Sequence, residues 1–375
     1  MTKIILLDVD GVLVTPGGYR AALHAALNHF VHLMGASQYD LEEEQLSEFE
    51  KRGIFSEWDM APLLIGGLWD EILSHHSDAR LPATLTAAAK EIGRMLDREH
   101  LPTHLHIPFF QIEDGKYPAE SALQQGCFPN IPYDLRVNLL SRTRDIHFSE
   151  TMRVFQQFSL GSRIFEKTYN LPAIIETDSL LARHDASNLT KEMLAKLTSD
   201  RHYLSTLTAR PSLPPKEIEN SPLGYAPEAE LALELVGLAG IPVTAFGKLE
   251  YIAAQHGLDP VKLLKPSPFQ ALAATLAAWT GDELHALRAA YNWHVSGNLN
   301  GEFDGLPKSF ELIVVEDTMG GIRSTRAAGE IFQKAGYDVN IRPLGLTGGS
   351  PAKAMAFEAA DVPYFDNWES LMAGL

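Results

Sequence analysis

The sequence has little cysteine, no long apolar run and no cluster of basic residues. A single cysteine, Cys127, among 375 residues excludes an internal disulfide framework and predicts a small buried side chain. The first apolar run, residues 4–7, is interrupted by Asp8 and Asp10, and no stretch approaches the roughly 18 apolar residues of a membrane span. We therefore expect a cytoplasmic protein with no export signal and no membrane partner.

Basic residues are scarce relative to acidic ones. The chain has 31 lysines and arginines against 48 aspartates and glutamates, a formal net charge of −17. This balance disfavours nucleic acid as a partner, so we expect a small molecule instead. An anionic substrate would have to be neutralised locally, by a divalent cation and one or two lysines. The sequence leaves the oligomeric state open.

The first part of the chain predicts a strand followed by a large helical insertion. Residues 3–7 have the pattern of a short buried strand, and a turn cluster of threonine, proline and glycine follows at 15–18. From about residue 19 to about residue 200, apolar residues recur mainly every three or four positions, as in Leu23 and Leu27. We therefore predict a mainly helical domain over residues 17–199.

Strands and helices alternate in the remainder of the chain. A helix is predicted over residues 227–238. The predicted strands span residues 203–207, 241–246, 312–315 and 339–346. This alternation is typical of an α/β fold, a Rossmann-like three-layer core with a parallel sheet, built here from residues 1–16 and 200–375. Ligands of such a sheet bind at the carboxyl ends of its strands.

Polar side chains follow three of the predicted strands. These residues are Asp8 and Asp10 after the first strand, Thr208 after the second, and Glu316 and Asp317 after a later one. Lys265 lies in a proline-containing loop between them. Phosphoryl transfer needs a nucleophile, a cation against the phosphoryl oxygens and a proton donor for the leaving group. The residue types at this edge of the sheet match those needs.

Each of these side chains suits one part of that chemistry. Asp8 can form an aspartyl-phosphate, and Asp10 can protonate the leaving oxygen and later activate water. Gly11 permits a sharp exit of the chain without a Cβ near the phosphate. Asp8 and Asp317 can share an oxygen-liganded Mg²⁺. Lys265 adds positive charge.

Thr208 would donate a hydrogen bond to a phosphoryl oxygen, although Thr206 competes for that role. Structural roles compete as well. Thr208 could belong to an ordinary loop, Lys265 could be a solvated lysine, and Glu316 and Asp317 could cap a helix that begins near Met319.

Four segments together resemble the motifs of haloacid dehalogenase-like hydrolases. They are Asp8–Leu13, Thr208–Pro211, Lys265–Pro266 and Val315–Ile322. The continuation Arg326–Gly329 resembles the helix that follows the fourth motif in the phosphatase and phosphoglucomutase branches of this family. The resemblance implies Asp8 as nucleophile, Asp10 as acid and base, and Thr208, Lys265 and Gly11 at the phosphate. It also implies Mg²⁺ ligands from Asp8, Asp317, the backbone carbonyl of Asp10 and, beside them, Glu316.

An aspartate at the position of Asp10 marks phosphatases and phosphomutases in this family, whereas the dehalogenases lack it. The sequence therefore predicts a Mg²⁺-dependent phosphatase acting on a small organic phosphate monoester. A phosphomutase acting on a sugar phosphate is the nearest alternative, and a non-catalytic binding or regulatory protein on the same core is another. The helical insertion occupies the place of a cap domain in such relatives, but is larger than their usual helical cap.

Overall fold

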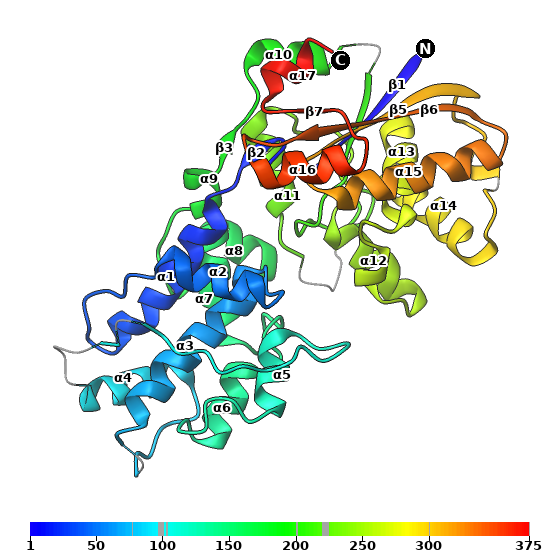
Figure 1. The fold of residues 1–375 in the computed structure, drawn as a ribbon. Coiled ribbons are helices and arrows are strands. Elements are labelled where there is room, and N and C mark those ends of the chain that lie inside the picture. Colours follow the sequence, from blue (N-terminus) through cyan, green and yellow to red (C-terminus); the bar gives the residue numbers. More distant parts are fainter. Residues whose placement is uncertain are drawn as a thin grey trace. The chain divides into compact units, whose positions relative to one another are not determined.

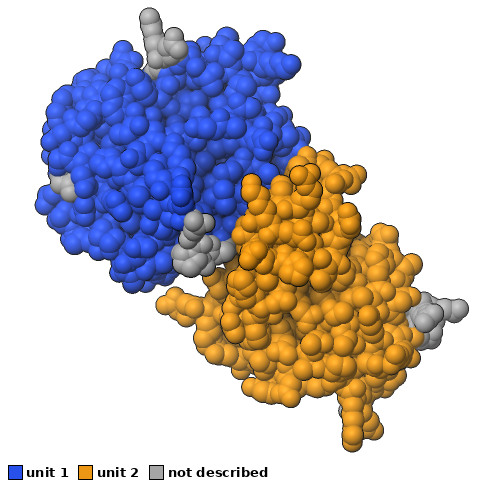
Figure 2. Space-filling view, turned by 180° about the vertical axis from the view of Figure 1, so that it is seen from behind, with its two compact units in different colours: residues 1–16, 185–375 blue, residues 17–184 orange. Residues whose placement is uncertain are grey.

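A computed structural model describes residues 1–76, 78–96, 101–102, 104–199, 202–219, 225–299 and 301–374 (Figure 1). The chain divides into two compact units, coloured separately in Figure 2. The core unit comprises Met1–Pro16 and Asp185–Leu375, and the helical unit comprises Gly17–His184. The predicted α/β class, a parallel sheet flanked by helices together with a helical domain, is confirmed.

A five-stranded sheet forms the centre of the core unit, and every pairing in it is parallel. In spatial order, its strands are β4 (His202–Thr206), β1 (Thr2–Leu7), β5 (Ser309–Glu316), β6 (Asp338–Leu346) and β7 (Tyr364–Phe365). In the register of this sheet, Leu7 pairs with Thr206 on one side and with Val315 on the other. The residues that follow these three strands therefore meet at one edge of the sheet.

Helices cover both faces of this sheet, because alternate side chains of its strands point to opposite sides. Ile4 and Leu6 belong to one buried apolar cluster, and Ile5 and Leu7 belong to another. The first face packs against α12 (Phe246–His256), α13 (Pro268–Thr280), α14 (Glu283–Ser296), α15 (Met319–Lys334) and Phe357 of α16 (Pro351–Ala359). The second packs against α10 (Lys191–Leu197), α11 (Glu228–Val236) and α17 (Trp368–Met372). These are the three layers that the sequence predicts.

The predicted strand over residues 241–246 is wrong. The segment runs beside the end of β4, where the N–H of Thr206 donates to the carbonyl of Pro242 at 3.1 Å. Pro242 has no N–H to return, and the N–H of Thr244 donates to the side-chain Oγ1 of Thr206 at 3.1 Å. A regular ladder therefore does not form, and α12 begins at Phe246.

The return from the helical unit to the core lies earlier than the predicted boundary at residue 199. The short strands β2 (Val14–Thr15) and β3 (Ala186–Ser187) pair antiparallel, and Leu197 of α10 is fully buried in the core cluster beneath the sheet. Residues 185–199 therefore pack with the core, although their apolar spacing is helical. Residue 200, where we placed the start of the second core segment, lies outside the described residues.

The helical unit has an apolar cluster of its own. Its helices are α1 (Gly18–Leu33), α2 (Glu43–Lys51), α3 (Glu57–Leu73), α4 (Leu85–Met95), α5 (Pro118–Gln124), α6 (Tyr133–Leu140), α7 (Glu150–Leu160), α8 (Ser162–Tyr169) and α9 (Leu180–His184). The predicted stripe on α1 is buried, and Phe30 meets Trp69 of α3 edge to face at 6.0 Å between ring centroids. Among the described residues, the helices are too short or too polar to cross a membrane.

Candidate active site

Three carboxylates gather at the carboxyl edge of the sheet. Asp8 follows β1, Glu316 ends β5, and Asp317 comes next. One oxygen from each lies within 4.8 Å of the others. Asp8 and Glu316 adjoin because Leu7 and Val315 are paired in register. The sequence-predicted neighbours are thus brought together by strand pairing.

Lys265 lies among these carboxylates. Its Nζ is 2.9 Å from Oδ2 of Asp8 and donates to Oε1 of Glu316 at 2.6 Å. It also donates to the carbonyl of Leu207, which follows β4, at 3.2 Å. The alternative of a solvated surface lysine is therefore wrong for Lys265, whose side chain is only 12% exposed.

Burial and neighbouring charges shift the pKa values of both Asp8 and Lys265. Burial raises the pKa of Asp8 well above its ordinary value, and repulsion from Glu316 adds to this against the attraction of Lys265. For Lys265, burial disfavours the charged form, but Asp8 and Glu316 outweigh it, and the pKa of the lysine is raised. The attraction of Lys265 therefore does not offset the effect of burial and repulsion on Asp8.

This donor set fits a hard divalent cation. Asp8, Glu316 and Asp317 offer carboxylate oxygens, which Mg²⁺ and Ca²⁺ prefer, and the repulsion at Asp8 is the kind that a bound cation relieves. Gly11 lies in close contact with this set. Its φ is +73°, and a Cβ there would lie 2.2 Å from Oδ2 of Asp317. The close approach and the positive φ both require glycine.

Glu316 also has a structural role, which differs from the helix capping that the sequence left open. Its Oε2 accepts hydrogen bonds from the N–H groups of Asp317 and Thr318, each at 3.1 Å, just before α15 begins at Met319. Its other oxygen faces Lys265. Glu316 thus fixes the turn that presents Asp317, but it does not cap α15, whose N-cap residue Thr318 has no side-chain capping hydrogen bond.

Both candidate threonines are buried. Thr206 lies inside β4, level with Leu7, and its Oγ1 accepts the N–H of Thr244. Thr208 lies past the end of the strand, and its Oγ1 accepts the N–H of Arg210 at 3.2 Å. Thr208 is therefore the one placed in the loop at the edge of the sheet.

Two cations of the site were missed from the sequence. Arg210 binds the carboxylate of Asp10, and Lys353 of α16 approaches Oδ2 of Asp317 at 2.6 Å. Lys353 lies in the first turn of α16, and its sequence neighbours do not reveal that its ammonium points toward Asp317. The only signal for Arg210 was its position two residues after Thr208.

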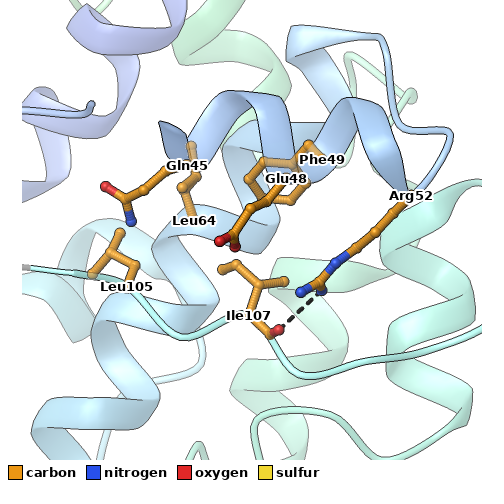
Figure 3. Close-up of a pocket in the computed structure, with 7 residues that line it drawn as sticks. All are labelled: Gln45, Glu48, Phe49, Arg52, Leu64, Leu105 and Ile107. Carbon is orange, nitrogen blue, oxygen red and sulfur yellow. Dashed lines mark hydrogen bonds between the residues drawn. The ribbon is translucent and has the colours of Figure 1, made fainter. Parts of the chain in front are cut away.

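A separate groove occurs in the helical unit (Figure 3). Its lining residues are Gln45, Glu48, Phe49, Arg52, Leu64, Leu105 and Ile107. Arg52 is occupied there, because its Nη1 donates to the carbonyl of Ile107 at 3.0 Å. With one carboxylate in a mostly apolar lining, this groove lacks the ligand set found at the edge of the sheet.

Comparison with known proteins defines the class of fold. No family model and no curated protein matches the sequence. The X-ray structure of a Northeast Structural Genomics Consortium target aligns with a TM-score of 0.69 at 14% sequence identity, covering 100% of this chain and 98% of that one. The similarity supports the fold, an α/β core with a helical unit, over the full length.

Proposed function

We propose that this protein is a Mg²⁺-dependent phosphatase that hydrolyses a small organic phosphate monoester through an aspartyl-phosphate at Asp8. The observation that carries the proposal is the cluster of Asp8, Glu316 and Asp317 with Lys265 between them, at the edge of the sheet where α/β proteins bind ligands. The resemblance to haloacid dehalogenase-like hydrolases points to the same chemistry.

In this proposal Asp8 forms the covalent bond to phosphorus, and Asp10 transfers the protons. An oxygen of Asp8 attacks phosphorus, the bond from phosphorus to the ester oxygen breaks, and Asp10 gives that oxygen a proton. Asp10 then takes a proton from water, the water oxygen attacks phosphorus, and the bond to Asp8 breaks. The products are the alcohol and inorganic phosphate, and both aspartates return to their starting states.

The remaining residues neutralise and orient the phosphoryl group. Lys265 supplies a fixed positive charge beside Asp8, and the hydroxyl of Thr208 would donate to a phosphoryl oxygen. Asp8, Asp317 and the backbone carbonyl of Asp10 would hold Mg²⁺, with Glu316 beside them. A bound Mg²⁺ would polarise the phosphoryl group and offset its negative charge. The absence of a side chain at Gly11 lets Asp317 approach the backbone closely, and in this proposal it also leaves no Cβ near the phosphate.

The test is release of inorganic phosphate with Mg²⁺ from a panel of sugar phosphates, nucleotides, phosphorylated acids and an aryl phosphate. We expect Asp8→Asn to lose activity by about three orders of magnitude or more, as removal of a covalent nucleophile does. Asp304→Asn is the control, since this carboxylate is 74% exposed and pairs only weakly with Lys308 at 3.9 Å. A parent protein as inactive as Asp8→Asn over the whole panel would contradict the proposal.

Metal binding gives a second measurement that does not depend on activity. Calorimetric titration should detect Mg²⁺ binding to the parent and to Asp304→Asn, and a loss of affinity of about tenfold or more in Asp317→Asn, because a charged oxygen ligand is removed. Equal affinity in all three proteins would remove Asp317 from the site. A sugar phosphate converted to its isomer without free phosphate would instead identify a phosphomutase.

A further inference from the structure

We infer that Arg210 is a positioning residue for Asp10, and that Asp185 in turn holds Arg210. The inference rests on the proposed function, in which Asp10 protonates the leaving oxygen. It adds two residues to that site, and neither belongs to the chemistry expected from the sequence. Arg210 acts on the reaction only through Asp10, and Asp185 acts only through Arg210.

The contacts between these three side chains are directional. Nε of Arg210 donates to Oδ1 of Asp10 at 3.1 Å and to Oδ2 at 2.9 Å, while Nη2 donates to Oδ1 at 2.5 Å. The same Nη2 donates to Oδ2 of Asp185 at 2.8 Å. A planar guanidinium that grips both oxygens of a carboxylate fixes its orientation as well as its position.

Asp185, Arg210 and Asp10 differ in how far their side chains are buried. The side chains of Arg210 and Asp185 are each 2% exposed, whereas that of Asp10 is 37% exposed. A guanidinium removed from water is stable when carboxylates accept its hydrogen bonds, and removing one partner of a buried pair leaves the other uncompensated. Asp10 is therefore anchored from the buried side, and its exposed side is left open to a ligand.

The backbone around Arg210 is also fixed. Its N–H donates to Oγ1 of Thr208 at 3.2 Å, and its carbonyl accepts the N–H of Phe246, the first residue of α12, at 3.0 Å. Asp185 is the first residue of the core unit after the helical unit ends. The guanidinium thus connects Asp10 to two segments of the core, the loop after β4 and the start of the second core segment at Asp185.

Positioning of Asp10 matters most when the leaving oxygen needs a proton. The 4-nitrophenolate ion departs readily without one, but the alkoxide of benzyl alcohol does not. The value of kcat/KM includes the steps up to leaving-group departure, so the ratio of kcat/KM for these two phosphates isolates the contribution of Asp10. A general defect of the fold would lower both values together.

We would measure this ratio, with Mg²⁺ and the full-length chain, for Arg210→Met, Arg210→Lys, Asp185→Asn and the double variant. Arg210→Met should lower kcat/KM for benzyl phosphate about 100-fold, since general acid catalysis contributes about 10²–10⁴-fold, and for 4-nitrophenyl phosphate by less than about tenfold. Arg210→Lys should recover part of the loss. Asp185→Asn should shift the ratio in the same direction, and the double variant should resemble Arg210→Met because Asp185 acts through Arg210.

Lys248→Met is the matched control. Lys248 is also a buried cation between two carboxylates of the core unit, Glu230 at 3.2 Å and Glu283 at 3.1 Å. Its loss should destabilise the fold without changing the substrate ratio. Should Arg210→Met fail to fold, as judged by circular dichroism, Asp185→Asn decides the question alone, because it keeps the side-chain shape.

The outcomes separate the two proposals. Equal losses on both phosphates, or additive effects of Asp185→Asn and Arg210→Met, would overturn the positioning role while leaving a phosphatase in place. A parent protein without activity on either phosphate or on the wider panel would overturn the proposed function, and the role of Arg210 with it.

Discussion

Asp8 is a buried carboxylate whose neighbours include two further carboxylates and one lysine. Its pKa is raised because burial and the charge of Glu316 outweigh the attraction of Lys265. Such an arrangement destabilises the folded chain in the absence of a cation. It also creates a negative electrostatic potential that would attract a cation. At the scale of single residues, stability and the proposed function therefore oppose each other at Asp8.

Replacing Asp8 by asparagine removes this conflict at constant size. Without metal at pH 7, we expect Asp8→Asn to have a higher free energy of unfolding than the parent, because a neutral amide replaces the ionised carboxylate that burial and Glu316 disfavour. A carboxyl whose pKa is raised by folding contributes stability at low pH, and this is lost as pH rises above its ordinary value of 3.8. The advantage of the variant should thus be small at pH 4 and grow toward pH 8.

Urea denaturation with a chelator between pH 4 and pH 8 measures this difference. The exposed control Asp304→Asn should follow the parent at every pH. A less stable Asp8→Asn at neutral pH would mean that the attraction between Asp8 and Lys265 exceeds the cost of burial and repulsion.

Short elements decide where the core unit resumes after the helical unit. Strands β2 and β3 contain two residues each, yet Asn188, just after β3, connects them to the segment that follows Asp8. Its N–H donates to the carbonyl of Leu13 at 2.9 Å, and its Nδ2 donates to the carbonyl of Val12 at 3.0 Å. Its Oδ1 accepts the hydroxyl of Thr15 at 2.7 Å. These contacts close the core across 173 residues of chain.

Asn188→Ala should remove the two side-chain hydrogen bonds and lower the free energy of unfolding of the core by about 1–2 kcal/mol, since one such bond contributes about 0.5–1.5 kcal/mol. Chemical denaturation followed by a core-unit signal checks this. Asn340→Ala is the control, because the exposed side chain of Asn340 makes one long hydrogen bond of 3.4 Å to Glu311. Equal small effects of both substitutions would show that this junction does not stabilise the core.

At the scale of the whole molecule, the helical unit has an apolar cluster separate from the two clusters of the core unit. The helical unit buries its own cluster, centred on residues such as Phe30, Trp69 and Phe155, and its two ends adjoin. A Cβ placed on Gly17 would lie 2.6 Å from the carbonyl oxygen of His184. Adjacent ends and a complete core are features of an inserted domain that can fold by itself.

We therefore expect residues 17–184, produced alone, to form a helical protein that unfolds cooperatively on heating. Circular dichroism and calorimetry measure helix content and cooperativity. Trp69→Ala in the same fragment should lower the stability by about 3–5 kcal/mol, the cost of truncating a fully buried aromatic side chain, or prevent folding. A fragment with little helix, or with a gradual transition unaffected by Trp69→Ala, would show that this unit depends on the core.

The sequence by itself determined the α/β class, the parallel sheet and the position of Asp8, Glu316 and Asp317 at strand ends. These follow from local patterns, because a buried strand reads as an apolar run and polar residues after parallel strands share one edge. The strand predicted over 241–246 failed for a local reason too, since Pro242 cannot donate to a ladder.

The tertiary structure alone decided which charges pair. Arg210 meets Asp10 and Asp185, and Lys353 meets Asp317, through side chains separated by 25 to 200 positions in the chain. Periodicity carries no information about such pairs, because they depend on where loops return. The same holds for the boundary at residue 184, which is set by the pairing of β2 with β3 and by the burial of Leu197.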